Sequence, residues 1–150
     1  MENFSGLTPE ERARLLDLEK SVELDKARPK IKKDFLSFVK YVWPEFIEGS
    51  HHKKINKKFN DLASGKIKRL IINMPPRHTK SEFASYLLPA WMVGLDPRLK
   101  IIQATHTADL AVDFGRKTKN LVDQPNYKEL FDTRLMEDSQ AAGKWKTEQG

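Results

Sequence analysis

The residues that could do chemistry in this chain are concentrated at positions 77–81, which read Arg-His-Thr-Lys-Ser. A short aliphatic run, Leu70–Ile72, precedes them and predicts a strand buried on both faces. Pro75 and Pro76 end that strand, because proline donates no ladder hydrogen bond. From Lys80 onward the apolar residues recur at helical spacing. A strand, a tight loop and a helix with Lys-Ser at the junction form the context that a phosphate-binding loop needs.

This loop suits the phosphates of a nucleotide. Amides at a helix N-terminus lack helical acceptors, and the helix dipole favours an anion. The Lys80 ammonium would reach the β- and γ-phosphates, and the Ser81 hydroxyl would ligate Mg²⁺. Arg77 would stabilise charge on the γ-phosphate, so Arg77 and Lys80 are the predicted catalytic residues. The predicted nucleotide-binding loop residues are Pro76, Arg77, His78, Thr79, Lys80 and Ser81.

The loop departs from the pattern G-x-x-x-x-G-K-[ST] at both glycines. Met74 stands at the first glycine and Thr79 at the second. If the second position needs a positive φ, a β-branched threonine is strained there. On this pattern alone, a phosphate-binding loop and a plain strand-to-helix turn are equally compatible with the sequence.

The sequence around the loop resembles a known family. Ile-Ile-Asn-Met-Pro-Pro-Arg-His-Thr-Lys-Ser-Glu, residues 71–82, resembles the deviant Walker A motif of tailed-phage terminase large subunits, the ATP-driven motors that package viral DNA. Family members usually carry glycine where this chain has Thr79. The resemblance covers Phe35 to Gly150 through an ordered series of flanking segments: Phe59–Arg69, Leu88–Trp91, Ala104–Ala111, Phe114–Thr118 and Ala142–Gly150.

The resemblance implies an α/β fold with a P-loop NTPase-like parallel sheet core, incomplete in this chain, and a helical N-terminal region. Residues 1–34 would form an N-terminal helix and a basic linker, and residues 35–150 the N-terminal portion of a P-loop ATPase domain. In the family, the Walker B strand and the nuclease domain follow the region where this chain stops. We therefore expect ATP and Mg²⁺ as cofactors, with weak nucleotide binding and no turnover by these residues alone.

The resemblance also implies partners: double-stranded DNA, the portal protein, the small terminase subunit and further copies in a homo-oligomeric ring in the host cytoplasm. The net charge of +6 and the pI near 9.5 independently favour a polyanionic partner. Cysteine is absent, and no apolar run approaches a membrane span. The candidate DNA contacts are Lys53, Lys57, Arg116 and Lys119.

His51 and His52 stand at the start of a predicted helix over residues 52–64. In the resembling family this segment often helps to hold adenine, so His52 is a candidate contact for the base. The alternative is two polar residues at a helix N-terminus. The four histidines show no metal-ligand spacing.

Capping residues and apolar spacing predict the remaining elements. A helix begins after Thr8, with Leu15, Leu16, Leu18 and Val22 on its apolar side, and residues 26–33 read as the basic linker. Asp34 starts a second helix that ends at Trp43-Pro44. A second strand is predicted over Leu99–Thr105, giving a βαβ unit, and Thr107 caps a further helix. A helical turn spans residues 127–131, and residues 132–150 read as irregular or weakly extended.

A competing hypothesis comes from another functional class. The chain would be a non-catalytic basic module, a truncated or split terminase product that binds DNA or packaging partners and merely retains the loop. The two hypotheses differ at Lys80, because Lys80→Ala abolishes nucleotide binding in the first and leaves DNA binding intact in the second.

Overall fold

The computed structural model describes residues 8–141 and 143–150, and this part of the chain is mostly helical. A single two-stranded antiparallel sheet accompanies the helices in the described residues. In chain order the elements are α1 (Pro9–Lys33), α2 (Phe35–Val42), α3 (Ser50–Ala63), η1 (Glu82–Leu87), α4 (Leu88–Leu95), α5 (Ala108–Val122), α6 (Pro125–Leu130), β1 (Leu135–Ala141) and β2 (Lys144–Thr147).

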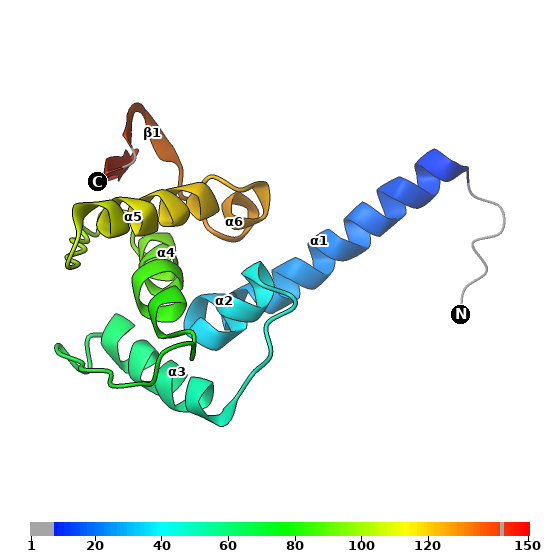
Figure 1. The fold of residues 1–150 in the computed structure, drawn as a ribbon. Helices are drawn as coiled ribbons and strands as arrows, with labels where there is room; N and C mark the ends of the chain where they lie inside the picture. Colours follow the sequence, from blue (N-terminus) through cyan, green and yellow to red (C-terminus); the bar gives the residue numbers. More distant parts are fainter. Residues whose placement is uncertain (1–7, 142) are drawn as a thin grey trace.

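Helix α1 is longer than the sequence predicted. It starts at the predicted capping box, in which the Thr8 hydroxyl accepts from the Glu11 N–H and the Glu11 carboxylate accepts from the Thr8 N–H. The prediction of a basic linker at residues 26–33 was wrong, because this segment continues the helix to Lys33 with Pro29 inside it. The N-terminal half of α1 projects away from the rest of the molecule (Figure 1).

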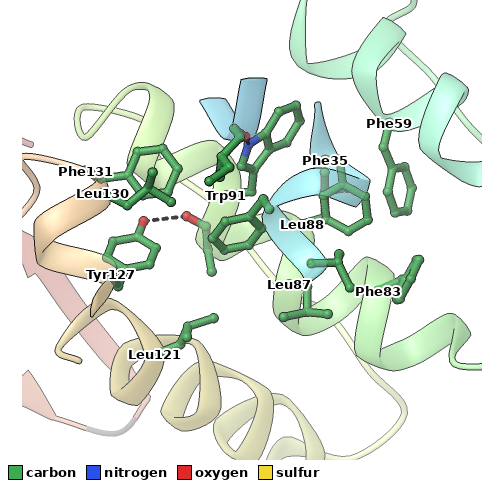
Figure 2. Close-up of a cluster of buried hydrophobic side chains, with 14 of the residues drawn as sticks. Phe35, Phe59, Phe83, Leu87, Leu88, Trp91, Leu121, Tyr127, Leu130 and Phe131 are labelled. Carbon is green, nitrogen blue, oxygen red and sulfur yellow. Dashed lines mark hydrogen bonds between the residues drawn. The ribbon is translucent and has the colours of Figure 1, made fainter. Parts of the chain in front are cut away.

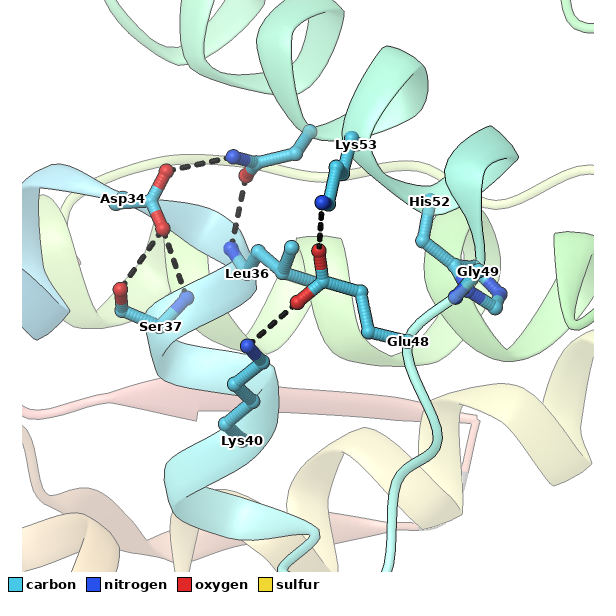
Figure 3. A network of polar contacts seen from close by, with 9 residues as sticks. Asp34, Leu36, Ser37, Lys40, Glu48, Gly49, His52 and Lys53 are labelled. Atoms are coloured by element: carbon cyan, nitrogen blue, oxygen red, sulfur yellow. Dashed lines mark hydrogen bonds and ion pairs between the residues drawn. The ribbon is translucent and has the colours of Figure 1, made fainter.

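The start of α2 is fixed by side chains that satisfy its unpaired amides. Asp34 caps the helix by accepting from the Ser37 N–H at 2.9 Å. The Asn60 and Asn56 side chains of α3 accept from the Phe35 and Leu36 N–H groups and donate to the Asp34 carboxylate. This network, part of which is drawn in Figure 3, joins α2 to α3. Burial raises the pKa of Asp34, but the hydrogen bonds from Asn56, Asn60 and Ser37 outweigh burial and hold the pKa below its ordinary value.

An aromatic core lies between α2, α3, η1, α4 and α6. Phe35 of α2 meets the rings of Phe59, Phe83 and Trp91 edge-on, with centroids 5.0–5.7 Å apart. Figure 2 shows these rings and the hydrogen bond that Tyr127 of α6 donates to the Ala90 carbonyl, at 2.6 Å. The apolar residues that recur at helical spacing from Lys80 onward are therefore confirmed as core, since Phe83, Leu87 and Leu88 are buried in it.

The two predicted parallel strands are not formed in the described structure. Residues 70–72 and 99–105 belong to no strand. Leu70, Ile72 and Met74 pack against the core, whereas Ile71 is 86% exposed. In the second segment Ile102 is 94% exposed. The expectation that Leu70–Ile72 is buried on both faces is wrong, because nothing among the described residues covers its outer side.

The helix after the loop continues through Pro89, a residue type that often bends or ends a helix. The π-helical turn η1 leads directly into α4, and its Phe83 carbonyl accepts from the Leu88 N–H five residues later. Proline at position 89 leaves the Ser85 carbonyl without its usual helical donor. The Gln103 side chain donates to that carbonyl instead. A contact from the second unpaired segment therefore stabilises the helix that follows the loop.

The C-terminal segment, which the sequence predicted as irregular or weakly extended, forms a regular hairpin. Strand β1 pairs antiparallel with β2, with Leu135 opposite Thr147 and Ala141 opposite Lys144. Thr147 is buried, and Trp145 is half-buried and donates to the Gly115 carbonyl of α5 at 3.1 Å. Trp145 therefore anchors the hairpin to α5.

Candidate phosphate-binding site

The loop at residues 75–80 turns sharply into the helix that follows it. Arg77 has φ 63° and Thr79 has φ 58°, both in the left-handed region that favours glycine. The sequence predicted strain if Thr79 needed a positive φ, and the structure places it there. The Phe83 N–H then donates to the Thr79 carbonyl at 2.9 Å, so Thr79 directly precedes the helix.

This geometry leaves donors available at the helix N-terminus. Because the first helical hydrogen bond starts at Phe83, the amides of Lys80, Ser81 and Glu82 have no helical acceptor. The side chains of Arg77 and Lys80 are exposed, and neither has a carboxylate within ion-pair distance among the described residues. Residues 77–82 therefore carry both unpaired amides and unpaired cations, which is the chemistry that binds an anion.

His52 of α3 connects its own helix to the loop through hydrogen bonds. Its Nδ1 accepts from the Gly49 N–H at 2.8 Å, which puts the ring proton on Nε2. Nε2–H therefore donates to the Thr79 hydroxyl, also at 2.8 Å, and that hydroxyl donates to the His78 carbonyl at 2.7 Å. The His78 ring in turn donates from Nδ1 to the Pro76 carbonyl. A chain of hydrogen bonds thus connects α3 to the turn that carries the strained residue.

The surroundings of His52 keep its ring neutral. The side chain is 4% exposed and lies against Phe46, Phe83 and His51, with ring centroids 4.8, 5.0 and 3.8 Å away. Burial lowers the pKa of His52, the charges of His51 and His78 act in the same direction, and Glu48 opposes them. A neutral ring is the form that the observed hydrogen bonds require, because Nδ1 must accept.

These contacts give His52 a different role from the predicted one. Both of its ring nitrogens already have partners, and neighbouring rings pack against it. A base could therefore neither hydrogen-bond to this ring nor stack on it without displacing those groups. The structure makes His52 a support for the loop, and its role as an adenine contact is not favoured by this geometry.

The structure separates the candidate DNA contacts into two groups. Lys53 and Lys57 are exposed on α3, where Lys53 lies 3.6 Å from the Glu48 carboxylate. Arg116 and Lys119 lie on α5, where Arg116 pairs with Asp113 at 3.2 Å. In Figure 1, α4 lies between α3 and α5, so the two groups come from helices that are not neighbours. Whether either contacts DNA stays a prediction.

One contact near the site gives no signal in the sequence. Glu82, the residue after Ser81, pairs with Lys117 of α5 at 3.1 Å. The two residues are 35 positions apart, so no local spacing reveals the pair. It connects the first turn after the loop to α5, as the His52–Thr79 hydrogen bond connects the loop to α3.

Comparison of the chain with models of known protein families, with curated proteins and with solved structures found no match. Among the described residues, no group of three or more His, Cys, Asp or Glu side chains is arranged to hold a metal ion. None of the helices in that part of the chain is both long enough and apolar enough to span a bilayer.

Proposed function

We propose that this chain is the ATP-binding part of a viral terminase large subunit, the motor that packages phage DNA into a procapsid. The observation that carries the proposal is the loop at residues 75–80, which places Lys80 and Ser81 in the first turn of a helix. The motif that suggested the family thus coincides with a geometry suited to phosphate, despite the threonine at position 79.

The chemistry of the available donors fits a nucleoside triphosphate. The amides of Lys80 and Ser81 would face the phosphates, and the exposed Lys80 ammonium would neutralise the β- and γ-phosphate charge. The exposed Arg77 guanidinium would contact the γ-phosphate. Magnesium bound with the nucleotide would take the Ser81 hydroxyl as a ligand, and it would supply neutralisation of charge on the transferred phosphoryl group.

The proposed parent protein is an ATPase that couples hydrolysis to DNA translocation in the host cytoplasm, with a nuclease in its C-terminal part. Its proposed partners are double-stranded DNA, the portal protein, the small terminase subunit and further copies in a ring. The support for these partners is the resemblance in residues 35–150 and the net charge of +6.

Isothermal titration calorimetry with Mg²⁺-ATP tests the proposal. We expect saturable binding by the chain and its loss in Lys80→Ala, because a point charge next to two phosphates is removed. Lys57→Ala is a matched control, because this exposed lysine lies on α3, outside the loop. Equal binding by all three proteins, or binding that Lys57→Ala weakens as much as Lys80→Ala, would contradict a phosphate site at the loop.

One observation favours a second candidate function. The segments expected to form the parallel sheet are unpaired, and Lys53, Lys54, Lys57 and Lys58 are exposed on α3. A non-catalytic basic module that binds DNA through α3 would need neither the sheet nor the loop. DNA binding with a steep salt dependence, lost in a Lys53→Ala/Lys57→Ala double variant and kept in Lys80→Ala, would support this candidate.

A further inference from the structure

Helix α1 carries two apolar stripes on opposite faces. Leu24, Ala27 and Ile31 pack against the core. Leu15, Leu18 and Val22 repeat the same spacing nine residues earlier. Nine residues are two and a half turns of an α-helix, so the earlier stripe points away from the core.

Among the described residues, the earlier stripe does not pack against the core, and Leu15 within it is half-buried. Leu18 is 63% exposed and Val22 is 46% exposed. The helix cannot fold back to bury these side chains, because the face that contacts the core is the opposite one. A short projecting helix with an open apolar stripe gains little stability by itself, since most helical stability in proteins comes from packing.

We propose that a second copy of this chain covers the Leu15, Leu18 and Val22 stripe, with the two α1 helices antiparallel. Spacings of three and four residues are those of a two-helix seam, in which such side chains interlock. The half of α1 that carries the stripe projects away from the rest of the molecule (Figure 1), so a second helix can lie along it. The proposal concerns a surface outside the loop and does not depend on ATP binding.

The charges beside the stripe select the antiparallel orientation. With Leu15 of one copy against Leu18 of the other, Arg12 lies beside Glu19 of the second copy, and this attractive pair occurs twice by symmetry. In the parallel orientation, Glu11 and Asp25, which extend the stripe at its two ends, would each face the same carboxylate of the second copy. The antiparallel pair places Glu11 against Val22 and keeps these carboxylates apart.

Sedimentation equilibrium of the full chain over a concentration series tests the proposal. We expect a reversible monomer–dimer equilibrium. Leu18→Lys should weaken dimerisation by at least about tenfold, because each copy loses a buried leucine. Leu16→Lys is the matched control, since Leu16 is 54% exposed but lies about 100° around the helix from Leu15. Leu16→Lys should leave the equilibrium nearly unchanged.

Charge exchange tests the orientation. Arg12→Glu alone should weaken the dimer by about threefold, and Arg12→Glu combined with Glu19→Arg should restore it. If Arg14→Glu combined with Glu19→Arg restores the dimer instead, the two helices are parallel, and the proposed orientation is overturned. A chain that stays monomeric at every concentration, or a dimer that Leu18→Lys and Leu16→Lys weaken equally, would overturn the proposal itself. A monomer would leave the stripe to a partner of another sequence.

Discussion

At position 79 a glycine variant should be more stable than an alanine variant, which is the reverse of the usual order in a helix. Thr79 has φ 58°, a conformation that costs a residue with a Cβ atom about 1–2 kcal/mol. Alanine keeps this cost, and glycine removes it. Glycine in turn loses about 0.4–1 kcal/mol through the greater freedom of the unfolded chain. The glycine variant should therefore be more stable than the alanine variant by about 1 kcal/mol.

Both variants also lose the hydrogen bond from His52. The free-energy cost of this loss is the same in each, so it cancels when the two variants are compared. The buried Nε2–H of His52 is left without an acceptor in each case, at a cost of about 1–3 kcal/mol. Relative to the unsubstituted chain, Thr79→Ala should therefore be clearly destabilised. Thr79→Gly should be destabilised less, because the relieved strain offsets part of that cost.

Urea unfolding followed by circular dichroism measures these differences. Ser81 provides the matched control, because it lies two residues further along with φ −70° in a helical conformation. There the order should be the ordinary one, with Ser81→Ala more stable than Ser81→Gly by about 1 kcal/mol. If Thr79→Ala is as stable as Thr79→Gly or more so, Thr79 does not hold a positive φ, and the reasoning about the loop is wrong.

Three further predictions concern the residues that hold the site and the core. Because the pKa of His52 is lowered in the folded chain, its contribution to stability should be complete above about pH 6.5, the ordinary pKa of histidine, and be lost as the pH falls below that value. Urea midpoints measured across this pH range would show the loss. A His52→Gln variant that loses the same stability as the pH falls would contradict this. Asp34→Ala should cost about 2–4 kcal/mol, because it removes the cap of α2 and the acceptor for Asn56 and Asn60; a loss no larger than that of Ser37→Ala, measured by denaturant unfolding, would argue against the network. Tyr127→Phe should cost about 1–2 kcal/mol, since the ring still packs but the Ala90 carbonyl loses its donor; an unchanged melting temperature would mean that water replaces the hydroxyl.

Capping residues and apolar spacing predicted most helices well because both act locally. Thr8, Asp34 and Thr107 each stand at the N-terminus of a helix and accept from its first turn, as their residue types predicted. The basic segment at residues 26–33 was misread because Pro29 and a run of charges are typical of a linker. Packing of Ala27 and Ile31 against the core keeps that segment helical, and such packing is not visible from local spacing.

The strands show the limit of reading a sheet from one sequence. Ile71 and Ile102 belong to segments with strand composition, yet a strand exists only where a neighbour supplies its hydrogen bonds. The hairpin of β1 and β2 was missed for the opposite reason, because its composition is polar. Its available signal was Gly143 as a turn followed by Trp145 and Thr147 at alternating positions.

At the site, the sequence predicted the position of Lys80 and Ser81 at a helix start and the strain at Thr79. It missed the hydrogen bond between His52 and Thr79, because residues 27 positions apart meet only through the packing of α3 under the loop. The usual glycine needs no such partner. The departure from the pattern G-x-x-x-x-G-K-[ST] at Thr79 therefore carried structural information that the pattern itself did not.

The central claim, that the loop binds the phosphates of a nucleotide, is tested most directly by amide chemical shifts. Mg²⁺-ATP would be titrated into the ¹⁵N-labelled chain and its shifts recorded residue by residue. We expect the largest changes at the amides of residues 77–82, and their loss in Lys80→Ala. Changes confined to the lysine-rich face of α3, at Lys53 and Lys57, would mean general attraction of an anion to a basic surface and would contradict a phosphate site at the loop.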